Sequence, residues 1–448
     1  MNTHAVFTQR NLFMRSLVAV LACVSISACD QSGPSQKAEV VEIKAKLNGE
    51  SLLSAANLYA YTQLSETLNK AQALDSLITA FLHHPNPGSL EAAQNAWINT
   101  YQSYLTVDFF HAIPRFEKPI YHENGDTYQI LHEQLDSWPI EAGYIDYLPE
   151  YPLSGIINDM TLKISSEDIV GQHGFSDQRF ASIGFHPLEF LLFGQNGQRS
   201  AKDFVPQENS IEIIDIDNKA HPENTLDLDA SNTEHENISE AENSATDEVP
   251  HVHDDNPNLG PQNHNRRRDF LRMLSALLVT DLRKLVDRWE PAQGYYAKQW
   301  RQPQHTQNVQ RIYQVSMDTL QQELLNRHLF PLLNLDELED LRSPFSNKDS
   351  ANMLAILQGI NDLFHVENGF IWELATREPS AAKNISQQFE KIIIETKKFP
   401  HDLTSKTLIS RKKIIAPVQQ SLLKLLETLY AGAEVLDLPL TELPVSTH

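Results

Sequence analysis

One short stretch holds a histidine and a carboxylate at a spacing that could do chemistry. In Gly184–Gly194, which reads GFHPLEFLLFG, His186 and Glu189 are three residues apart within an apolar run. On a helix, positions i and i+3 share a face, so these side chains could hold one cation or share one proton. Proline is tolerated only in the first helical turn, so Pro187 places His186 near the N-cap or in that turn. The alternative is a capping histidine followed by a first-turn carboxylate that favours the helix dipole.

Other landmarks surround this pair, and together they resemble a known family. Gly184, His186 and Glu189 match a G-x-H-x-x-E motif. The remaining landmarks are Trp97, Tyr101, Tyr104 and Asp108; Trp138 within Ser137–Ile140; Asp281 and Trp289; and the loop Ser343, Pro344, Phe345 and Ser346. From about Leu52 to about Tyr430 they are similar to the imelysin family, also described as M75 peptidase-like or iron-regulated proteins. Two positions depart from it, because the family usually has arginine where Tyr101 stands and glutamate where Asp108 stands.

The resemblance implies an all-α fold and a site. It implies two helical bundles, with the Ser343–Ser346 loop near the cleft between them. It nominates His186 and Glu189 as metal ligands, and Asp108 is the third contributor that we expect. Iron is the metal expected first, with zinc and calcium as alternatives. Haem is a further alternative, since one histidine can serve as an axial ligand.

The N-terminus reads as an export signal. Arg10 and Arg15 precede a short apolar core at 17–26, which is too short to span a bilayer. The core ends in Ile-Ser-Ala before Cys29, as in a lipobox, so we expect Cys29 to be lipidated; an ordinary cleaved signal is the alternative. The protein would then be anchored on the periplasmic side of a bacterial membrane, and Asp30 favours the inner membrane.

Composition narrows the function classes. The 448 residues are 41% hydrophobic, with a formal net charge of −23. Such acidity disfavours nucleic acid and suits cations. Of the 2 cysteines, Cys23 lies within the signal, so the mature chain would have no disulfide and no thiolate cage. Metal ligands would be His, Asp, Glu or Tyr.

Hydrophobic periodicity indicates helices and little strand. We expect helices at about 64–81, from Ser89 onward, from Asp269 to Trp289, and near 306–330, 350–376, 380–397 and 412–432. Prolines should break 114–183 into loops and short helices, where His132, Glu133, His173 and Asp177 read as surface residues. The predicted organisation is a signal peptide at 1–28, a tether at 29–50, an N-terminal helical domain at 51–197, an insertion at 198–265, a C-terminal bundle at 266–435 and a tail at 436–448.

The insertion differs in composition from the rest of the chain. Residues 198–265 hold 16 Asp or Glu, 3 Lys or Arg and 5 His. Such a stretch buries too little apolar surface to offset chain entropy, so we expect disorder. It is typical of a solvated acidic linker; a weak metal-gathering tether around His251 and His253 is the alternative.

The motif favours binding over catalysis. A zinc hydrolase needs three protein ligands, an open water position and a general base. H-x-x-E supplies one histidine and one carboxylate, and no H-E-x-x-H occurs in the chain. The sequence therefore predicts a metal-binding envelope lipoprotein linked to iron or haem uptake, with a transporter as its partner. An M75-type metallopeptidase and a structural or protein-docking module are the alternatives.

Overall fold

The computed structural model describes residues 47–116, 128–207, 263–334, 341–400 and 407–441. In these ranges the chain is helical, and β-pairing is limited to one isolated bridge between Leu148 and Tyr151. The all-α prediction is confirmed. No described helix is both long and apolar enough to cross a membrane. The predicted signal peptide, Cys29 and most of the tether lie outside the described residues.

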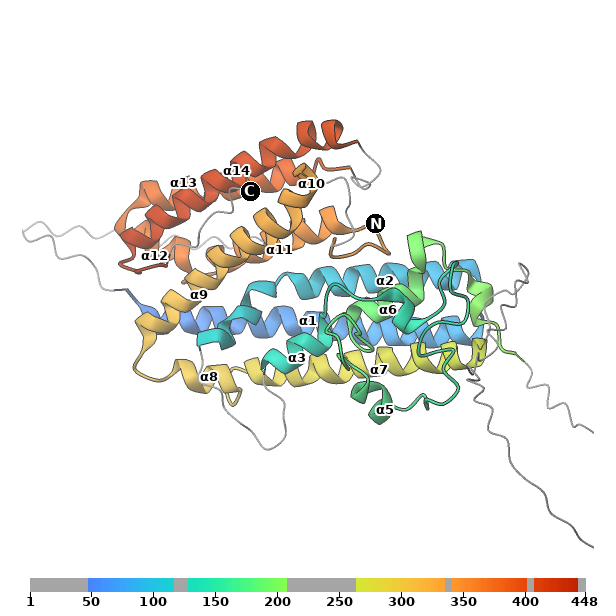
Figure 1. Ribbon diagram of the computed structural model, residues 1–448. Coiled ribbons are helices and arrows are strands. Elements are labelled where there is room, and N and C mark those ends of the chain that lie inside the picture. The colour runs from blue at the N-terminus through green and yellow to red at the C-terminus, as the bar shows by residue number, and fades with distance from the viewer. Residues whose placement is uncertain (1–46, 117–127, 208–262, 335–340, 401–406, 442–448) are drawn as a thin grey trace, which may run out of the picture. The chain divides into compact units, whose positions relative to one another are not determined.

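The elements follow one another as a series of long helices separated by short ones (Figure 1). They are α1 (Gly49–His83), α2 (Pro87–Leu105), η1 (Asp108–Phe116), α3 (Tyr128–Leu135), α4 (Ala142–Ile145), α5 (Ser166–Gly171), α6 (Phe185–Phe193), η2 (Gln195–Gly197), η3 (Ala201–Phe204), α7 (His264–Trp289), α8 (Tyr295–Trp300), α9 (His305–Thr319), η4 (Leu320–Leu329), α10 (Phe330–Asn334), α11 (Asp349–His365), α12 (Phe370–Arg377), α13 (Pro379–Thr396) and α14 (Leu408–Val435).

The first two long helices are separated by a well-formed cap. The Asn86 side chain accepts the backbone N–H groups of Gly88 and Ser89, and the Ser89 hydroxyl accepts the N–H of Asn86. This is a capping box with Pro87 at the first helical position. The helix was predicted from Ser89 onward; it begins earlier, at Pro87, because Asn86 is the N-cap residue.

Packing joins the helices into one core. α1 lies against α2 and α7, and α13 lies against α14 and α12. Two helices link these groups, since α9 contacts α1, η1 and α14, while α11 contacts α2, α12 and α13 (Figure 1). The described residues fall in one compact unit, Ala45–His448. The division into two bundle domains stays a prediction.

The ends of the predicted insertion are folded. Residues 198–207 and 263–265 are described, and Phe204 is buried with its ring 5.0 Å from that of Phe81. Helix α7 begins at His264 and not at Asp269. Its Arg267 is buried against Asp146, with Nε 2.7 Å from Oδ2. Residues 208–262, with His251 and His253, lie outside the described residues.

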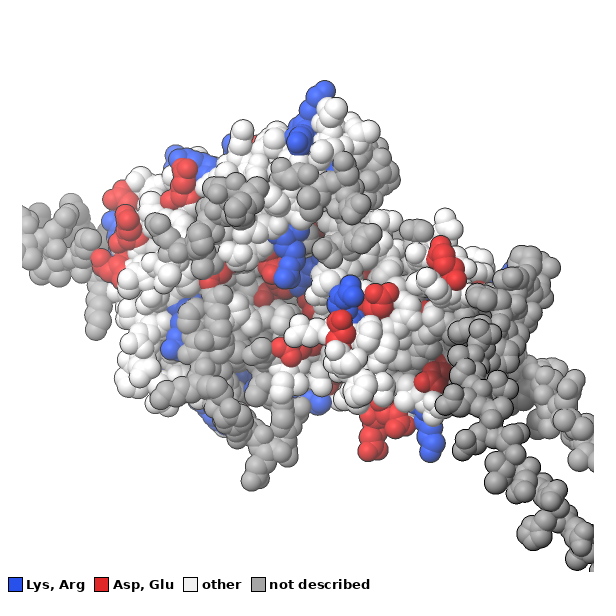
Figure 2. All heavy atoms as spheres, viewed as in Figure 1, with Lys and Arg blue, Asp and Glu red and all other residues white. Residues whose placement is uncertain are grey.

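Two further features bear on the site. The predicted helix near 306–330 changes character within its length, because α9 continues directly into the π-helix η4. π-helical segments are rare and frequently occur at functional sites. On the face shown in Figure 2, acidic and basic side chains are mixed and form no large area of one sign.

Candidate functional site

Helix α6 carries His186 and Glu189, as the sequence spacing predicted. Gly184 is the N-cap residue, with φ +99°, and His186 lies in the first turn. A Cβ at Gly184 would lie 2.3 Å from the backbone oxygen of Gln134. Position 184 must therefore be glycine for two reasons, its backbone angle and its close contact with the end of α3.

His186 is held between two carboxylates. Its Nδ1 is 3.2 Å from Oε2 of Glu189, and its Nε2 is 3.0 Å from Oδ1 of Asp136. All three side chains are buried. Burial alone would lower the pKa of His186, but the hydrogen bonds and charges of the two carboxylates outweigh burial and raise the pKa. The raised pKa favours the imidazolium form, in which each ring N–H donates to one carboxylate.

Asp136 is the centre of a larger network. Its Oδ1 also accepts the hydroxyl proton of Tyr101 at 2.8 Å, and its Oδ2 accepts an N–H of Arg342. Burial opposes the charge of Asp136, but the guanidinium of Arg342, followed by His186, holds the pKa of Asp136 well below its usual range. Asp136 is therefore an ionised, buried carboxylate with three hydrogen-bond donors.

Arg342 extends this network towards Asp108. Its Nη2 donates to Oδ1 of Asp108 at 2.8 Å, and its Nε donates to the hydroxyl oxygen of Tyr101 at 2.9 Å. Tyr101 stands where the resemblance expects an arginine. A guanidinium is nevertheless present at this place, supplied by a residue 241 positions further along the chain.

Glu189 joins the network to the Ser343–Ser346 loop. Its Oε1 accepts the backbone N–H of Ser346 at 2.9 Å. The ring of Phe345 lies 5.0 Å from that of Phe190, and Ser343 is buried in the same loop. The loop is thereby fixed against α6, and the second oxygen of Glu189 is occupied.

Aromatic rings close off the histidine from water. Trp97 donates its indole N–H to the backbone oxygen of Phe185 at 3.0 Å. The ring of Trp138 lies 4.9 Å from that of His186. Hydrogen bonds between charged groups are stronger in such a low-dielectric setting than in water.

The three predicted ligands do not converge. Asp108 bonds to Arg342, on the far side of Asp136 from His186. In the described part of the chain, no group of three or more His, Cys, Asp or Glu side chains is placed to hold a metal ion. A histidine must be deprotonated to bind a metal, and both nitrogens of His186 face carboxylates. This arrangement fits an ion-pair network and not a bare metal ion, and metal binding by His186, Glu189 and Asp108 stays a prediction.

A polar pocket of about 200 Å³ opens beside Arg342. The π-helix η4 contributes Glu323 and Arg327, whose Oε2 and Nη1 lie 3.2 Å apart. Burial raises the pKa of Glu323, with nearby Asp108 adding to the shift and Arg342 opposing it. The lining residues are Asp108, His111, Ala112, His132, Asp136, Trp138, Thr319, Glu323, Arg327 and Arg342.

Two histidines in this pocket are kept neutral. The rings of His111 and His132 are stacked with centroids 4.1 Å apart, and Nδ1 of His132 is 3.1 Å from the hydroxyl of Tyr104. Burial is the main cause that lowers the pKa of each, and for His111 the neighbouring His132 adds to it. Uncharged imidazole is the form that binds metals.

Several of these residues were missed or misassigned from the sequence. Asp136 and Arg342 were not singled out, although each stands one residue before a motif segment, at Ser137 and Ser343. His132 was assigned to the surface, but it is half-buried and lines the pocket. The available signal was the position of Asp136 and Arg342 beside the motifs, since neither has a revealing spacing of its own.

Comparisons with known proteins agree with this architecture. The family model Imelysin (Peptidase_M75) matches residues 60–431. No curated protein matches the chain. A solved structure from Parabacteroides distasonis ATCC 8503, assigned as an iron-regulated protein A precursor, is 12% identical, with a TM-score of 0.54, covering 88% of this chain and 97% of that one. An imelysin-like protein from Psychrobacter arcticum 273-4 is also 12% identical, with a TM-score of 0.55 and coverage of 89% and 99%.

Fold and site together define the class: an all-α protein with a histidine–carboxylate pair buried at the start of a short helix. The chain belongs to the imelysin family, since the family model covers most of its length. At 12% identity the solved structures support the fold alone.

Proposed function

We propose that the protein is a binding protein of the cell envelope, held by a lipid on Cys29, whose cargo is a metal ion, with iron as the first candidate. The cargo site in this proposal is the polar pocket, and not the buried H-x-x-E pair. The pair His111 and His132 carries the proposal, because burial lowers the pKa of both rings and uncharged imidazole is the form that binds metals. Asp108 and Glu323 line the same pocket and favour a cation.

The volume of the pocket favours a metal ion with small ligands over a large metal complex such as haem. At about 200 Å³ it is smaller than the roughly 300–1,000 Å³ of pockets that take drug-sized ligands. Two histidines do not complete a coordination sphere, so the ion would keep water or a small chelator as further ligands. Imidazole suits iron and zinc. An iron ion with small ligands therefore fits the pocket better than haem.

The geometry favours binding over peptide hydrolysis. A zinc peptidase requires a neutral histidine ligand and a free general base. The two carboxylates around His186 raise its pKa and favour the protonated ring, and the oxygens of Glu189 face His186 and Ser346. Neither residue is available for the peptidase role in this arrangement. We propose that the cargo passes to an envelope transporter and that nucleic acid is no partner of this acidic chain.

Calorimetric titration with ferrous, ferric-citrate and zinc ions tests the cargo and its site. We expect His132→Ala to weaken iron binding at least about tenfold, by analogy with the loss on removing groups around metal sites. The matched control is His83→Ala, an exposed histidine on α1, which should bind as the wild type does. Circular dichroism should show equal helix content in all three proteins.

Two further variants separate the pocket from the H-x-x-E pair. If His186 and Glu189 coordinate the ion directly, His186→Ala and Glu189→Ala abolish binding while His132→Ala leaves it intact, and the pocket proposal is wrong. If all these proteins bind iron equally, neither the pocket nor the H-x-x-E pair is the cargo site and the pocket proposal is wrong. If none binds it, the metal-linked function is refuted. Elemental analysis of the purified mature protein gives an independent measure.

A further inference from the structure

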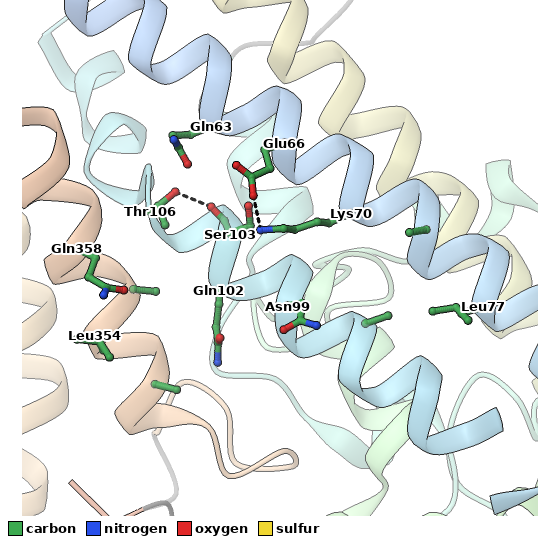
Figure 3. Close-up of a pocket in the computed structure, with 14 residues that line it drawn as sticks. Gln63, Glu66, Lys70, Leu77, Asn99, Gln102, Ser103, Thr106, Leu354 and Gln358 are labelled. Carbon is green, nitrogen blue, oxygen red and sulfur yellow. Dashed lines mark hydrogen bonds and ion pairs between the residues drawn. The ribbon is translucent and has the colours of Figure 1, made fainter. Parts of the chain in front are cut away.

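A second cavity lies beside α2. The face of α2 that lines this cavity is not the face that contacts the ion network. The cavity is a groove of about 590 Å³ between α1, α2 and α11 (Figure 3). Trp97 and Tyr101 of α2 contact α6 and the network. Asn99 and Gln102 line the groove instead. None of the groove residues lines the pocket beside Arg342, so the two cavities are separate.

Primary amides from three helices line this groove. Gln63 comes from α1, Asn99 and Gln102 from α2, and Gln358 from α11 (Figure 3). None of these four amide groups hydrogen-bonds another residue that the structure describes. Each amide offers two N–H donors and one carbonyl acceptor. The groove therefore presents donors and acceptors from all three helices that line it.

The rest of the lining is small, apolar or internally paired. Lys70 and Glu66 form an ion pair with Nζ and Oε1 2.8 Å apart, so they add no net charge. Ser103 accepts the hydroxyl proton of Thr67 at 2.9 Å. The apolar lining residues are Ala73, Leu77, Ala96, Ala351, Leu354 and Ala355. An uncharged ligand with alternating polar groups suits such a surface.

The groove is held open by close contacts near one end. A Cβ at Gly359 of α11 would lie 1.9 Å from the backbone oxygen of Thr106, which follows α2. Tyr59 of α1 donates its hydroxyl proton to the backbone oxygen of Gly359 at 2.9 Å. These contacts fix the three helices relative to one another. A site that is formed in advance loses less entropy when a ligand binds.

We propose that this groove binds an extended peptide segment, mainly through its backbone. In an extended chain the N–H and C=O of one residue point to the same side, so a primary amide can donate to that C=O and accept from that N–H. From Gln63 to Leu77, α1 rises about 21 Å at 1.5 Å per residue, which matches about six residues of extended chain at 3.3 Å each. The lining has no aromatic side chain on which a sugar ring could stack, which favours a peptide over an oligosaccharide. The alanines leave room for side chains of varied sequence.

Affinity selection from a degenerate heptapeptide mixture tests the proposal. The full chain is immobilised, the enriched peptides are identified by mass spectrometry, and one is resynthesised with a fluorescent label for anisotropy titration. We expect Gln102→Ala/Gln358→Ala to weaken its binding about tenfold, since the hydrogen bonds of two amides to the peptide backbone are lost. The matched control is Gln72→Ala, an exposed α1 residue outside the groove, which should bind as the wild type does.

A second peptide tests the recognition chemistry. The same sequence with N-methylated backbone amides should bind at least about tenfold more weakly, because it has lost the N–H donors. Three results would each overturn the proposal: no enrichment over the double variant, equal affinity for the methylated peptide, or binding of maltohexaose in place of peptides. Iron binding should be the same in the double variant and the wild type, so this test is independent of the cargo site.

Discussion

Replacing Asp136 by asparagine tests whether the buried network is made of charges. Asp136 accepts from Tyr101, His186 and Arg342 in a fully buried position. Asparagine keeps an oxygen for two of these donors but places an NH₂ group against the guanidinium. Breaking a buried pair by removing one partner costs roughly 3–5 kcal/mol. We expect Asp136→Asn to lower the free energy of unfolding at pH 7 by about that amount.

The pH dependence should change with the same substitution. Because the pKa of His186 is raised in the folded protein, its stabilising contribution is complete below about pH 6.5 and is lost as the pH rises through the folded value. Without Asp136 the pKa of His186 should fall, so this alkaline loss should shrink. The depressed pKa of Asp136 acts in the opposite sense, since its contribution is present above about pH 3.9 and is lost on acidification.

Urea denaturation followed by circular dichroism, at several values between pH 5 and pH 9, measures the loss of stability at pH 7 and the alkaline loss. The matched control is Asp269→Asn, whose ion pair with Arg272 is exposed and should contribute little. A loss of less than about 1 kcal/mol in Asp136→Asn would contradict the buried-charge reasoning, since ordinary surface substitutions cost about that or less. An unchanged alkaline slope would show that His186 is not protonated in the folded protein.

Four further outcomes follow. Gly184→Ala should destabilise the fold by at least about 2 kcal/mol in urea, because φ is +99° and the new Cβ would meet the backbone oxygen of Gln134. Burial, followed by the charge of Glu189, raises the pKa of Asp349 to about 6, so the stability that its protonation gives is lost as the pH rises through 6. Asp349→Asn should therefore stabilise the protein by up to about 2–3 kcal/mol at pH 8 and hardly at all at pH 4; an equal gain at both would contradict this. Mass spectrometry should find a lipid on Cys29, and an unmodified terminus would refute it. Deleting residues 208–260 should leave helix content and melting temperature nearly unchanged, and a large loss of cooperativity would show that they contribute to the fold.

The helices could be predicted because their signals are local. The apolar residues of α1, α11 and α14 recur at helical spacing over many turns, and α6 lies between its two glycines. Boundaries were less certain, because Asn86 competed with Ser89 as a cap. The change from α9 to the π-helix η4 has no pattern of its own in the sequence.

The site was only partly predictable, because its partners are distant in the chain. His186 and Glu189 share one helical turn, and their pairing follows from spacing. Asp136 is 50 positions from His186 and 206 from Arg342. No local rule connects such positions, since they are brought together by the packing of α2, α3 and α6 and by the loop before α11. Asp108 was expected beside His186, but the guanidinium of Arg342 bonds it instead.

These distant partners decide what the H-x-x-E spacing does. The i,i+3 geometry suits joint metal coordination and a buried ion pair equally well, because both place two side chains on one helix face. Asp136 hydrogen-bonds Nε2 of His186, on the opposite side of the ring from Glu189, and favours the protonated ring. A protonated ring donates hydrogen bonds through both nitrogens and cannot bind a metal. Arg342 in turn keeps Asp136 ionised and extends to Asp108, at the edge of the pocket. The two histidines whose pKa burial lowers line that pocket, so under the proposed function the motif supports the wall of a cargo site that is built from other residues.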